Sequence, residues 1–178
     1  MQNETEGKNV ESSKFESNLK EENFNATIEG KEVKLYWLQN NDLKMAMTNY
    51  GGRIVSLYVP DKNGQLIDVS IGRGSVEEYE ASAKAYFGAT IGRVGNRIAK
   101  GKFTLDGNQY SIPTNNNENA LHGGNKGFQD VVWDAERPNE YTLVLTYTSP
   151  DMEEGFPGNL RAKVTYSLTD DNSLNRGQ

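Results

Sequence analysis

The chain has 178 residues, with 19 Lys and Arg against 25 Asp and Glu, a formal net charge of −6 and a pI near 4.9. This acidic balance argues against nucleic acid or an anionic membrane as a partner, because both need a basic face. The absence of cysteine excludes a disulfide framework and a thiolate nucleophile, but leaves the compartment open. No apolar run approaches the roughly 20 residues that span a bilayer, so we expect no membrane-spanning segment.

The first 24 residues differ in composition from the rest of the chain. They hold six Glu against three Lys, and their apolar residues follow no sustained period. Segments of this kind are typically solvated. We therefore predict a polar acidic leader or tether over residues 1–24 and one domain over residues 25–178. A tether or ragged terminus is favoured over the remnant of a removed export signal.

Strands and turns dominate the pattern from Val33 onward. Alternating or continuous apolar residues predict strands over the ranges 33–37, 43–47, 54–59, 66–71, 103–105, 109–112, 131–134, 141–148 and 160–168. Two turns support these ranges: Pro60 with Asn63-Gly64 favours a tight reversal, and Asp106-Gly107 is a strong hairpin signal.

One short helix is expected, over residues 75–85. Ser75 can cap its first turn, and Glu77 and Glu78 favour the positive amino-terminal end of the helix. Many short strands with at most one or two short helices indicate an all-β fold, either a sandwich or a barrel.

Four large apolar residues are predicted to pack in the core of such a fold: Phe128, Trp133, Leu143 and Leu145. A Trp can also stack on a sugar ring, which is the alternative interpretation for Trp133. Its place in an apolar Val-Val-Trp run, rather than at a loop tip, favours the core.

Two glycine-rich segments, residues 88–103 and 118–124, carry the side chains most suited to binding a ligand. Arg97 offers a fixed fork of five donors, Asn96 has both donors and acceptors, and His122 is the only histidine of the chain. Together they suit a ligand made of adjacent hydroxyls, and we predict that they converge on one open cleft. Four glycines allow positive φ or close backbone approach: Gly92, Gly95, Gly123 and Gly124.

Other interpretations of these motifs are weaker. Arg93 is a better candidate than Arg97 for a structural role. A single histidine without cysteine or paired acids is a poor metal site, and the Asp151–Glu154 cluster lacks the ligand spacing of a calcium loop, so we expect a solvated loop there. The Gly-Arg-Val-Gly run has no following Lys-Ser/Thr and no strand-then-long-helix context, which argues against a nucleotide site.

Four blocks in order carry a resemblance to a known family. They are NYGGRI (49–54), GRVGNRIAKGKFTLDG (92–107), NALHGGNKGFQDVVWDA (119–135) and SPDMEEGFPGNL (149–160). The chain resembles the amino-terminal half of aldose 1-epimerases, the galactose mutarotase family, over roughly residues 33–172. The resemblance implies a large antiparallel β-sandwich, here truncated, and assigns substrate binding to Asn96, Arg97 and His122.

The resemblance also implies a reaction. In the family, a glutamate removes the proton of the anomeric hydroxyl and a histidine protonates the ring oxygen, so the sugar opens and recloses without metal or cofactor. This family acid and base are expected beyond residue 178, so we predict no catalytic residue in the chain itself. The implied function is interconversion of the α and β anomers of aldohexoses such as galactose or glucose; the alternative is a non-catalytic carbohydrate-binding fragment.

Two further expectations follow from the truncated sandwich and from the family. Unpaired strand edges make self-association possible. The location expected by family default is the cytoplasm, with export to the periplasm as the alternative.

Overall fold

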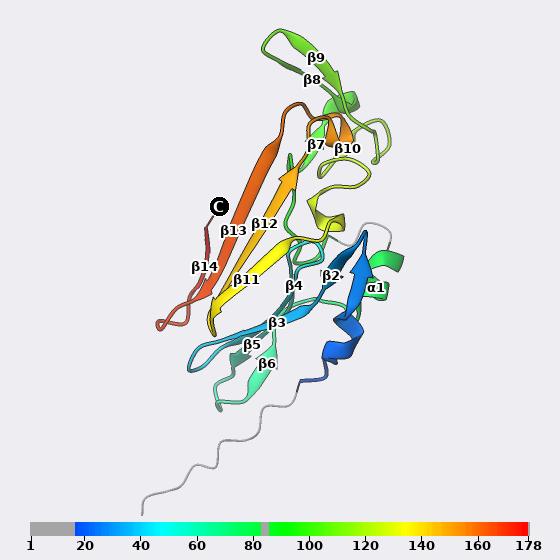
Figure 1. The fold of residues 1–178 in the computed structure, drawn as a ribbon. Helices are drawn as coiled ribbons and strands as arrows, with labels where there is room; N and C mark the ends of the chain where they lie inside the picture. Colours follow the sequence, from blue (N-terminus) through cyan, green and yellow to red (C-terminus); the bar gives the residue numbers. More distant parts are fainter. Residues whose placement is uncertain (1–16, 83–85, 178) are drawn as a thin grey trace, which may run out of the picture.

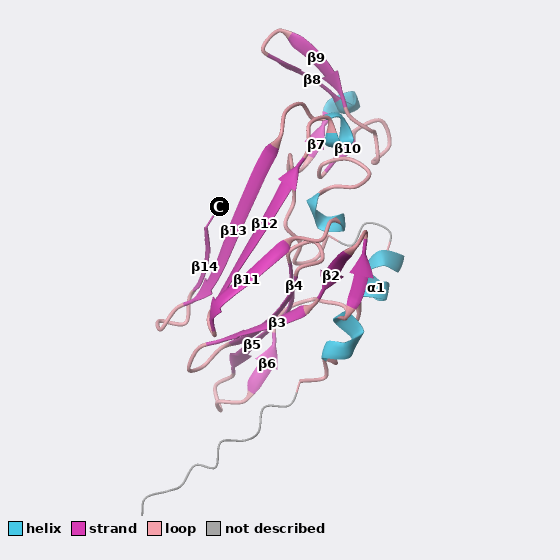
Figure 2. Cartoon of the chain, in the orientation of Figure 1, coloured by secondary structure: helices cyan, strands magenta, loops and turns pink. Residues whose placement is uncertain are grey.

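The computed structural model describes residues 17–82 and 86–177, and antiparallel strands dominate this part of the chain (Figures 1 and 2). One four-stranded sheet has the order β3-β4-β5-β6, built from Leu35–Gln39, Lys44–Thr48, Arg53–Pro60 and Leu66–Asp68. The other has the order β11-β12-β13-β14, built from Asp134–Asn139, Thr142–Ser149, Leu160–Leu168 and Leu174–Gly177. The predicted all-β sandwich is confirmed.

Smaller elements surround the two sheets. Three two-stranded ladders pair β1 with β2, β7 with β10 and β8 with β9, over Ala26–Ile28, Lys31–Val33, Arg97–Ile98, Ala120–Leu121, Lys102–Leu105 and Asn108–Ser111. The described helices are α1 (Val76–Ala81) and four 3-10 turns: η1 (Glu21–Phe24), η2 (Ala99–Gly101), η3 (Phe128–Asp130) and η4 (Glu153–Gly155). In the described part of the chain, no helix has the length and apolarity needed to cross a membrane.

The main core lies between the two four-stranded sheets. Its members come from β3, β4 and the turn between them on one side and from β12 and β13 on the other: Leu38, Leu43, Met45, Met47, Leu143, Leu145, Val164, Tyr166 and Leu168. Trp133 joins them at 1% exposure, and its indole N–H donates to the carbonyl of Phe128 at 3.1 Å. The core assignment of Trp133 and its three predicted neighbours is therefore confirmed, and burial of such side chains is a principal source of stability.

A second cluster covers the opposite face of the β3–β5 sheet. Because side chains alternate along a strand, Ala46 points away from Met45 and Met47 and packs with Val55. Val76 and Tyr79 of α1 cover this face. Phe24 belongs to the same cluster and is fully buried, whereas residues 1–16 lie outside the described part. The predicted domain boundary after residue 24 stays a prediction.

Several predicted elements differ from the structure in their bounds. The expected strand over 131–134 begins only at Asp134, because residues 131–133 cross to the turn before β5: Gly51 N–H donates to Val131 O at 2.8 Å and Trp133 N–H to Asn49 O at 2.9 Å. The chain there forms an isolated antiparallel bridge between Val132 and Tyr50 of that turn, and only then enters β11 of the other sheet. The strand expected over 33–37 is likewise divided, because the Lys34 N–H donates to the side chain of Asn49.

The strand expected over 66–71 and the helix expected over 75–85 are both shorter than predicted. The Asp68 carboxylate accepts the N–H groups of Leu57 and Ser70, so a side chain takes one bond of the ladder. The Val69 N–H still donates to Leu57 O at 2.9 Å, but β6 ends at Asp68. Ser75 caps α1 by accepting the Glu78 N–H at 3.1 Å, as predicted, but the helix ends at Ala81, and residues 83–85 lie outside the described part.

The predicted hairpin at Asp106-Gly107 is confirmed. Both residues have positive φ, which a two-residue hairpin turn of this twist requires. The β8–β9 hairpin projects beyond one end of the sandwich (Figure 1).

Candidate functional site

The β7–β10 ladder brings the two predicted ligand-binding segments together. Arg97 is opposite Leu121 in this ladder, and the pairing continues one residue further, where His122 N–H donates to Asn96 O at 3.0 Å. Asn96, Arg97 and His122 therefore lie side by side although 26 residues separate Asn96 from His122. Their role in ligand binding stays a prediction.

The imidazole of His122 is held on two sides. The peptide N–H of Asn96 donates to Nδ1 at 2.9 Å, and the Tyr86 ring packs edge to face with a centroid distance of 4.6 Å. Partial burial lowers the pKa of His122 from its ordinary value of 6.5, and the positive charge of Arg97 lowers it further. Both effects favour the neutral ring.

Arg97 is exposed and is oriented by asparagines. Its Nε donates to Asn116 Oδ1 at 3.0 Å, and its Nη1 donates to Asn96 Oδ1 at 3.3 Å. These bonds direct the planar guanidinium while leaving part of its donor fork without a partner in the described chain, which suits vicinal hydroxyls.

The asparagine-rich loop is part of this site's support, which the sequence did not indicate. The side chain of Asn115 accepts the Leu121 N–H at 2.7 Å and donates to Leu121 O at 2.9 Å, so it takes the place of a further strand beside β10. Asn116 and Asn119 bond reciprocally through their backbones and close the loop. Tyr86 was also missed, because an aromatic next to a histidine in space leaves no signal in the sequence.

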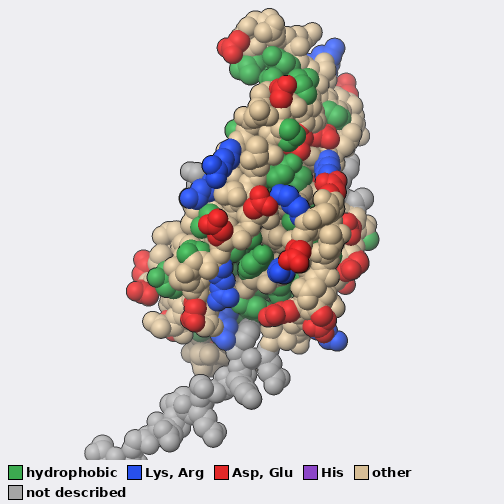
Figure 3. Space-filling model, viewed as in Figure 1, with side chains coloured by type: hydrophobic (Ala, Val, Ile, Leu, Met, Phe, Trp, Pro, Cys, Tyr) green, Lys and Arg blue, Asp and Glu red, His purple; other side chains and the backbone are tan. Residues whose placement is uncertain are grey.

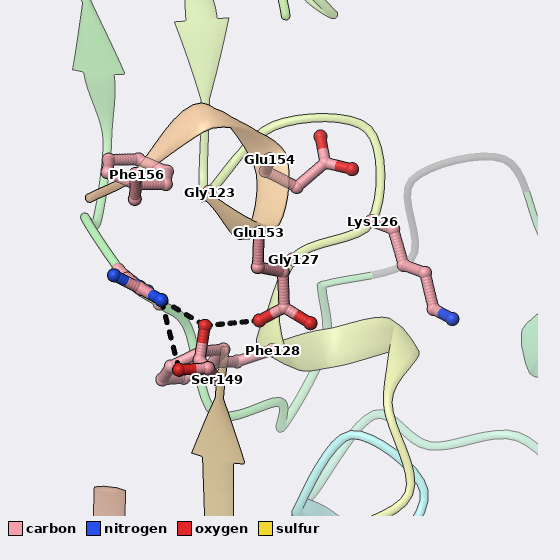
Figure 4. Close-up of a pocket in the computed structure, with 10 residues that line it drawn as sticks. Gly123, Lys126, Gly127, Phe128, Ser149, Glu153, Glu154 and Phe156 are labelled. Carbon is pink, nitrogen blue, oxygen red and sulfur yellow. Dashed lines mark hydrogen bonds between the residues drawn. The ribbon is translucent and has the colours of Figure 1, made fainter. Parts of the chain in front are cut away.

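Arg93 makes structural contacts, as the sequence predicted. It donates from Nε to Ser149 Oγ at 2.7 Å, from Nη1 to Pro157 O at 2.9 Å, and from Nη2 to Ser149 O and Pro150 O at 3.0 and 2.6 Å. Glu153 turns its carboxylate toward Ser149 (Figure 4) and accepts that hydroxyl as well as the Tyr147 hydroxyl. Burial and this neighbouring carboxylate raise the pKa of Tyr147.

The acidic loop over 151–154 is therefore less solvated than predicted. Glu153 accepts hydrogen bonds from the hydroxyls of Tyr147 and Ser149, and Ser149 in turn contacts Arg93. Glu154 accepts the Asn125 N–H at 2.6 Å next to the Gly123-Gly124 turn. Carboxylates take these places because loop N–H and hydroxyl groups there need acceptors.

Two glycines permit the close approach of the two segments. A Cβ at Gly123 would collide with the carbonyl oxygen of Gly92, and a Cβ at Gly92 would collide with the Phe128 ring. Gly123 also has a φ of +94°, a backbone conformation that glycine adopts at no steric cost because it lacks a Cβ. Gly95, in contrast, has room for a Cβ.

A polar cavity of about 220 Å³ adjoins the site through Tyr86 and Asn115. Its other lining residues are Arg53, Tyr79, Ser82, Asn125, Gln129 and Asp130. Burial raises the pKa of the half-buried Asp130. On the face shown in Figure 3, acidic and basic side chains are scattered, with apolar side chains between them.

The fold is that of a β-sandwich protein, and Asn96, Arg97 and His122 form one polar cluster where β7 and β10 pair. The family model for aldose 1-epimerase matches residues 34–176, and the chain belongs to this family.

Known proteins similar to the chain agree with this assignment. The chain is 43% identical to the galactose mutarotase of Sus scrofa over 136 residues, which cover 76% of the chain and 39% of that protein. It is 35% identical to the aldose 1-epimerase of Escherichia coli K12 over 147 residues, covering 82% of the chain and 42% of that protein. The chain thus spans about two fifths of the length of these curated relatives.

Two solved structures share the fold. A GalM/aldose epimerase homologue from C. elegans aligns with a TM-score of 0.76 at 31% identity, covering 80% of this chain and 44% of that one. A galactose 1-epimerase from Lactobacillus acidophilus aligns with a TM-score of 0.74 at 24% identity over 85% of this chain and 45% of that one.

Proposed function

We propose that this chain is the sugar-binding part of an aldose 1-epimerase that interconverts the anomers of aldohexoses such as galactose or glucose. The observation that carries the proposal is the junction of β7 and β10, where Asn96, Arg97 and His122 meet. Family membership supports the reaction, and the hydrogen-bond donors and acceptors of the three side chains support a substrate rich in hydroxyl groups.

The residues divide the work of binding. Arg97 donates charge-assisted hydrogen bonds to sugar hydroxyls, each worth about 1.5–3 kcal/mol. Asn96 donates and accepts beside it, and His122 contacts a sugar oxygen. Proton removal from the anomeric hydroxyl and proton delivery to the ring oxygen need two further groups, placed on opposite sides of the sugar. We assign both to a glutamate and a histidine beyond residue 178, so the chain by itself binds and does not catalyse.

Titration of the chain with galactose and glucose, followed by calorimetry or NMR, tests the binding. Arg97→Ala should weaken galactose binding about tenfold or more, the loss of at least one charge-assisted bond. Arg93→Ala is the matched control, because that guanidinium is engaged by carbonyls and Ser149. Weaker binding in Arg93→Ala than in Arg97→Ala, at equal folded fraction, would contradict the assignment.

Polarimetry on freshly dissolved α-galactose tests the division between binding and catalysis. The chain should leave the rate of anomer relaxation close to that of buffer, because the proposal assigns neither proton transfer to Asn96, Arg97 or His122. Relaxation clearly faster than buffer and abolished by His122→Ala would show that this part of the protein is catalytic. The second candidate is a non-catalytic sugar-binding role in the cell. It requires that the chain binds sugar and that a longer protein containing these residues also fails to accelerate relaxation.

The proposal also includes location and assembly. We place the protein in the cytoplasm, with export as the alternative, and cell fractionation distinguishes the two. We further propose self-association through the edge strand β6, because Ile67, Val69 and Ile71 at and after that strand are strongly exposed.

A further inference from the structure

The hydrogen bond at Nδ1 fixes which nitrogen of His122 carries the proton. A backbone nitrogen can only donate, so Nδ1, which lies 2.9 Å from the Asn96 peptide nitrogen, must accept. An accepting Nδ1 has no proton, and the proton of the neutral ring then lies on Nε2. The His122 N–H bond to Asn96 O, in the same pair of residues, keeps the two backbones in this register.

We infer that His122 is held as the neutral Nε2–H tautomer and meets the sugar only as a hydrogen-bond donor, with the Asn96 peptide and the Tyr86 ring as its positioning groups. The sugar in this statement rests on the proposed function. The tautomer does not, because it follows from contacts within the chain.

The surroundings of the ring oppose a second proton. Protonation at Nδ1 would direct two N–H groups at each other across the 2.9 Å contact and break that hydrogen bond. The positive charge of Arg97, on β7, also opposes a second proton on His122. Glu154, on η4, accepts the Asn125 N–H. Tyr86 contributes an aromatic edge contact that limits rotation about the ring axis.

A role follows for the reaction. A neutral imidazole N–H is far too weak an acid to give up its proton to a sugar oxygen, and Nδ1 is already occupied as an acceptor. His122 therefore orients the sugar through one N–H···O bond, and both proton transfers of ring opening pass through other groups. In this site, His122 orients the sugar, and other groups carry out the acid–base steps.

The left-handed backbone makes the arrangement possible. Asn96 has a φ of +64° and His122 a φ of +53°, a conformation that Asn adopts more readily than most residues. Asn96→Gly keeps both this φ and the donating N–H, so it should keep the tautomer. That variant separates the peptide's role from the side chain's role.

The only histidine of the chain makes the tautomer directly measurable. With ¹⁵N-labelled histidine, the folded chain at pH 7 should show one protonated nitrogen at Nε2 and one unprotonated nitrogen at Nδ1, with no averaging between tautomers. The same chain in denaturant should show the averaged mixture and a higher titration midpoint. A proton on Nδ1, or an imidazolium at pH 7, overturns the inference whether or not sugar binds.

Two substitutions test the donor role. His122→Gln puts an amide N–H near the position of Nε2, whereas His122→Asn reaches only as far as Nδ1. The galactose dissociation constant should stay within a few-fold of wild type for Gln and rise about tenfold for Asn, the worth of one hydrogen bond. Equal loss in both overturns the donor role, and absence of galactose binding by wild type overturns the proposed function while the ¹⁵N spectra still decide the tautomer.

The positioning role of Tyr86 has a spectroscopic test. Tyr86→Phe keeps the aromatic edge contact and should keep the single-tautomer spectrum. Tyr86→Leu removes it and should give exchange-broadened or averaged ring nitrogens at an unchanged unfolding midpoint. Identical spectra for the two variants would show that Tyr86 does not position the ring.

Discussion

Replacing Arg93 with Ala removes the most extensively bonded guanidinium beside the candidate site. Four hydrogen bonds disappear, to Ser149 Oγ, Ser149 O, Pro150 O and Pro157 O, at 2.6–3.0 Å. At about 1 kcal/mol net for each bond, the loss would reach roughly 4 kcal/mol. Water can replace the donor at the exposed Pro150 carbonyl, so the expected loss is roughly 3 kcal/mol.

The assay is chemical denaturation followed by tryptophan fluorescence, supported by a thermal melt. A loss of roughly 3 kcal/mol corresponds to a fall of roughly 6–12 °C in Tm for a chain of this size. Arg97→Ala is the matched control, because Arg97 is exposed and its truncation should change the free energy of unfolding by no more than about 0.5 kcal/mol. Arg93→Lys should fall between the two, since a single ammonium cannot reproduce the guanidinium fork.

Two results would refute this reasoning. Equal losses in Arg93→Ala and Arg97→Ala would show that the four bonds contribute no more than surface contacts. An unchanged free energy of unfolding in Arg93→Ala, with weakened galactose binding, would mean that the roles of the two arginines are exchanged.

Three other predictions concern the core, the histidine and the sheet edge. Trp133→Ala should lower the free energy of unfolding by about 3–5 kcal/mol in denaturant titration, and a loss under about 1 kcal/mol would contradict its place between the sheets. Because the pKa of His122 in the folded chain lies below its ordinary 6.5, the unfolded chain binds the proton first as the pH falls through 6.5. The free energy of unfolding of wild type should therefore fall relative to that of His122→Gln below pH 6.5 and not above it. A difference between the two proteins that does not change with pH would exclude the lowered pKa. Ile71→Lys should reduce self-association in light scattering, because Ile71 is 72% exposed beyond the edge strand β6; equal scattering by both proteins would place the contact elsewhere.

The sequence by itself determined the features that depend on a few neighbouring residues. Asp106-Gly107 specified a hairpin turn because both residues tolerate positive φ, and Ser75 specified the start of α1 because its hydroxyl accepts an N–H three residues on. The alternation of apolar residues separated the two faces of β4. The order and spacing of the four sequence blocks indicated the family, and residue chemistry singled out Asn96, Arg97 and His122.

Only the tertiary structure decided how distant segments meet. Arg93 finds its acceptors 56 to 64 residues away, and Tyr86 meets His122 across 36 positions of sequence. The chain over 131–133 leaves its expected strand because Asn49 and Gly51 offer partners from the other sheet. Nothing local specifies such contacts, because a side chain's partner depends on which surfaces pack together once the whole sheet has formed. The tautomer of His122 belongs to the same category, since it depends on one peptide N–H that only the β7–β10 pairing brings to the ring.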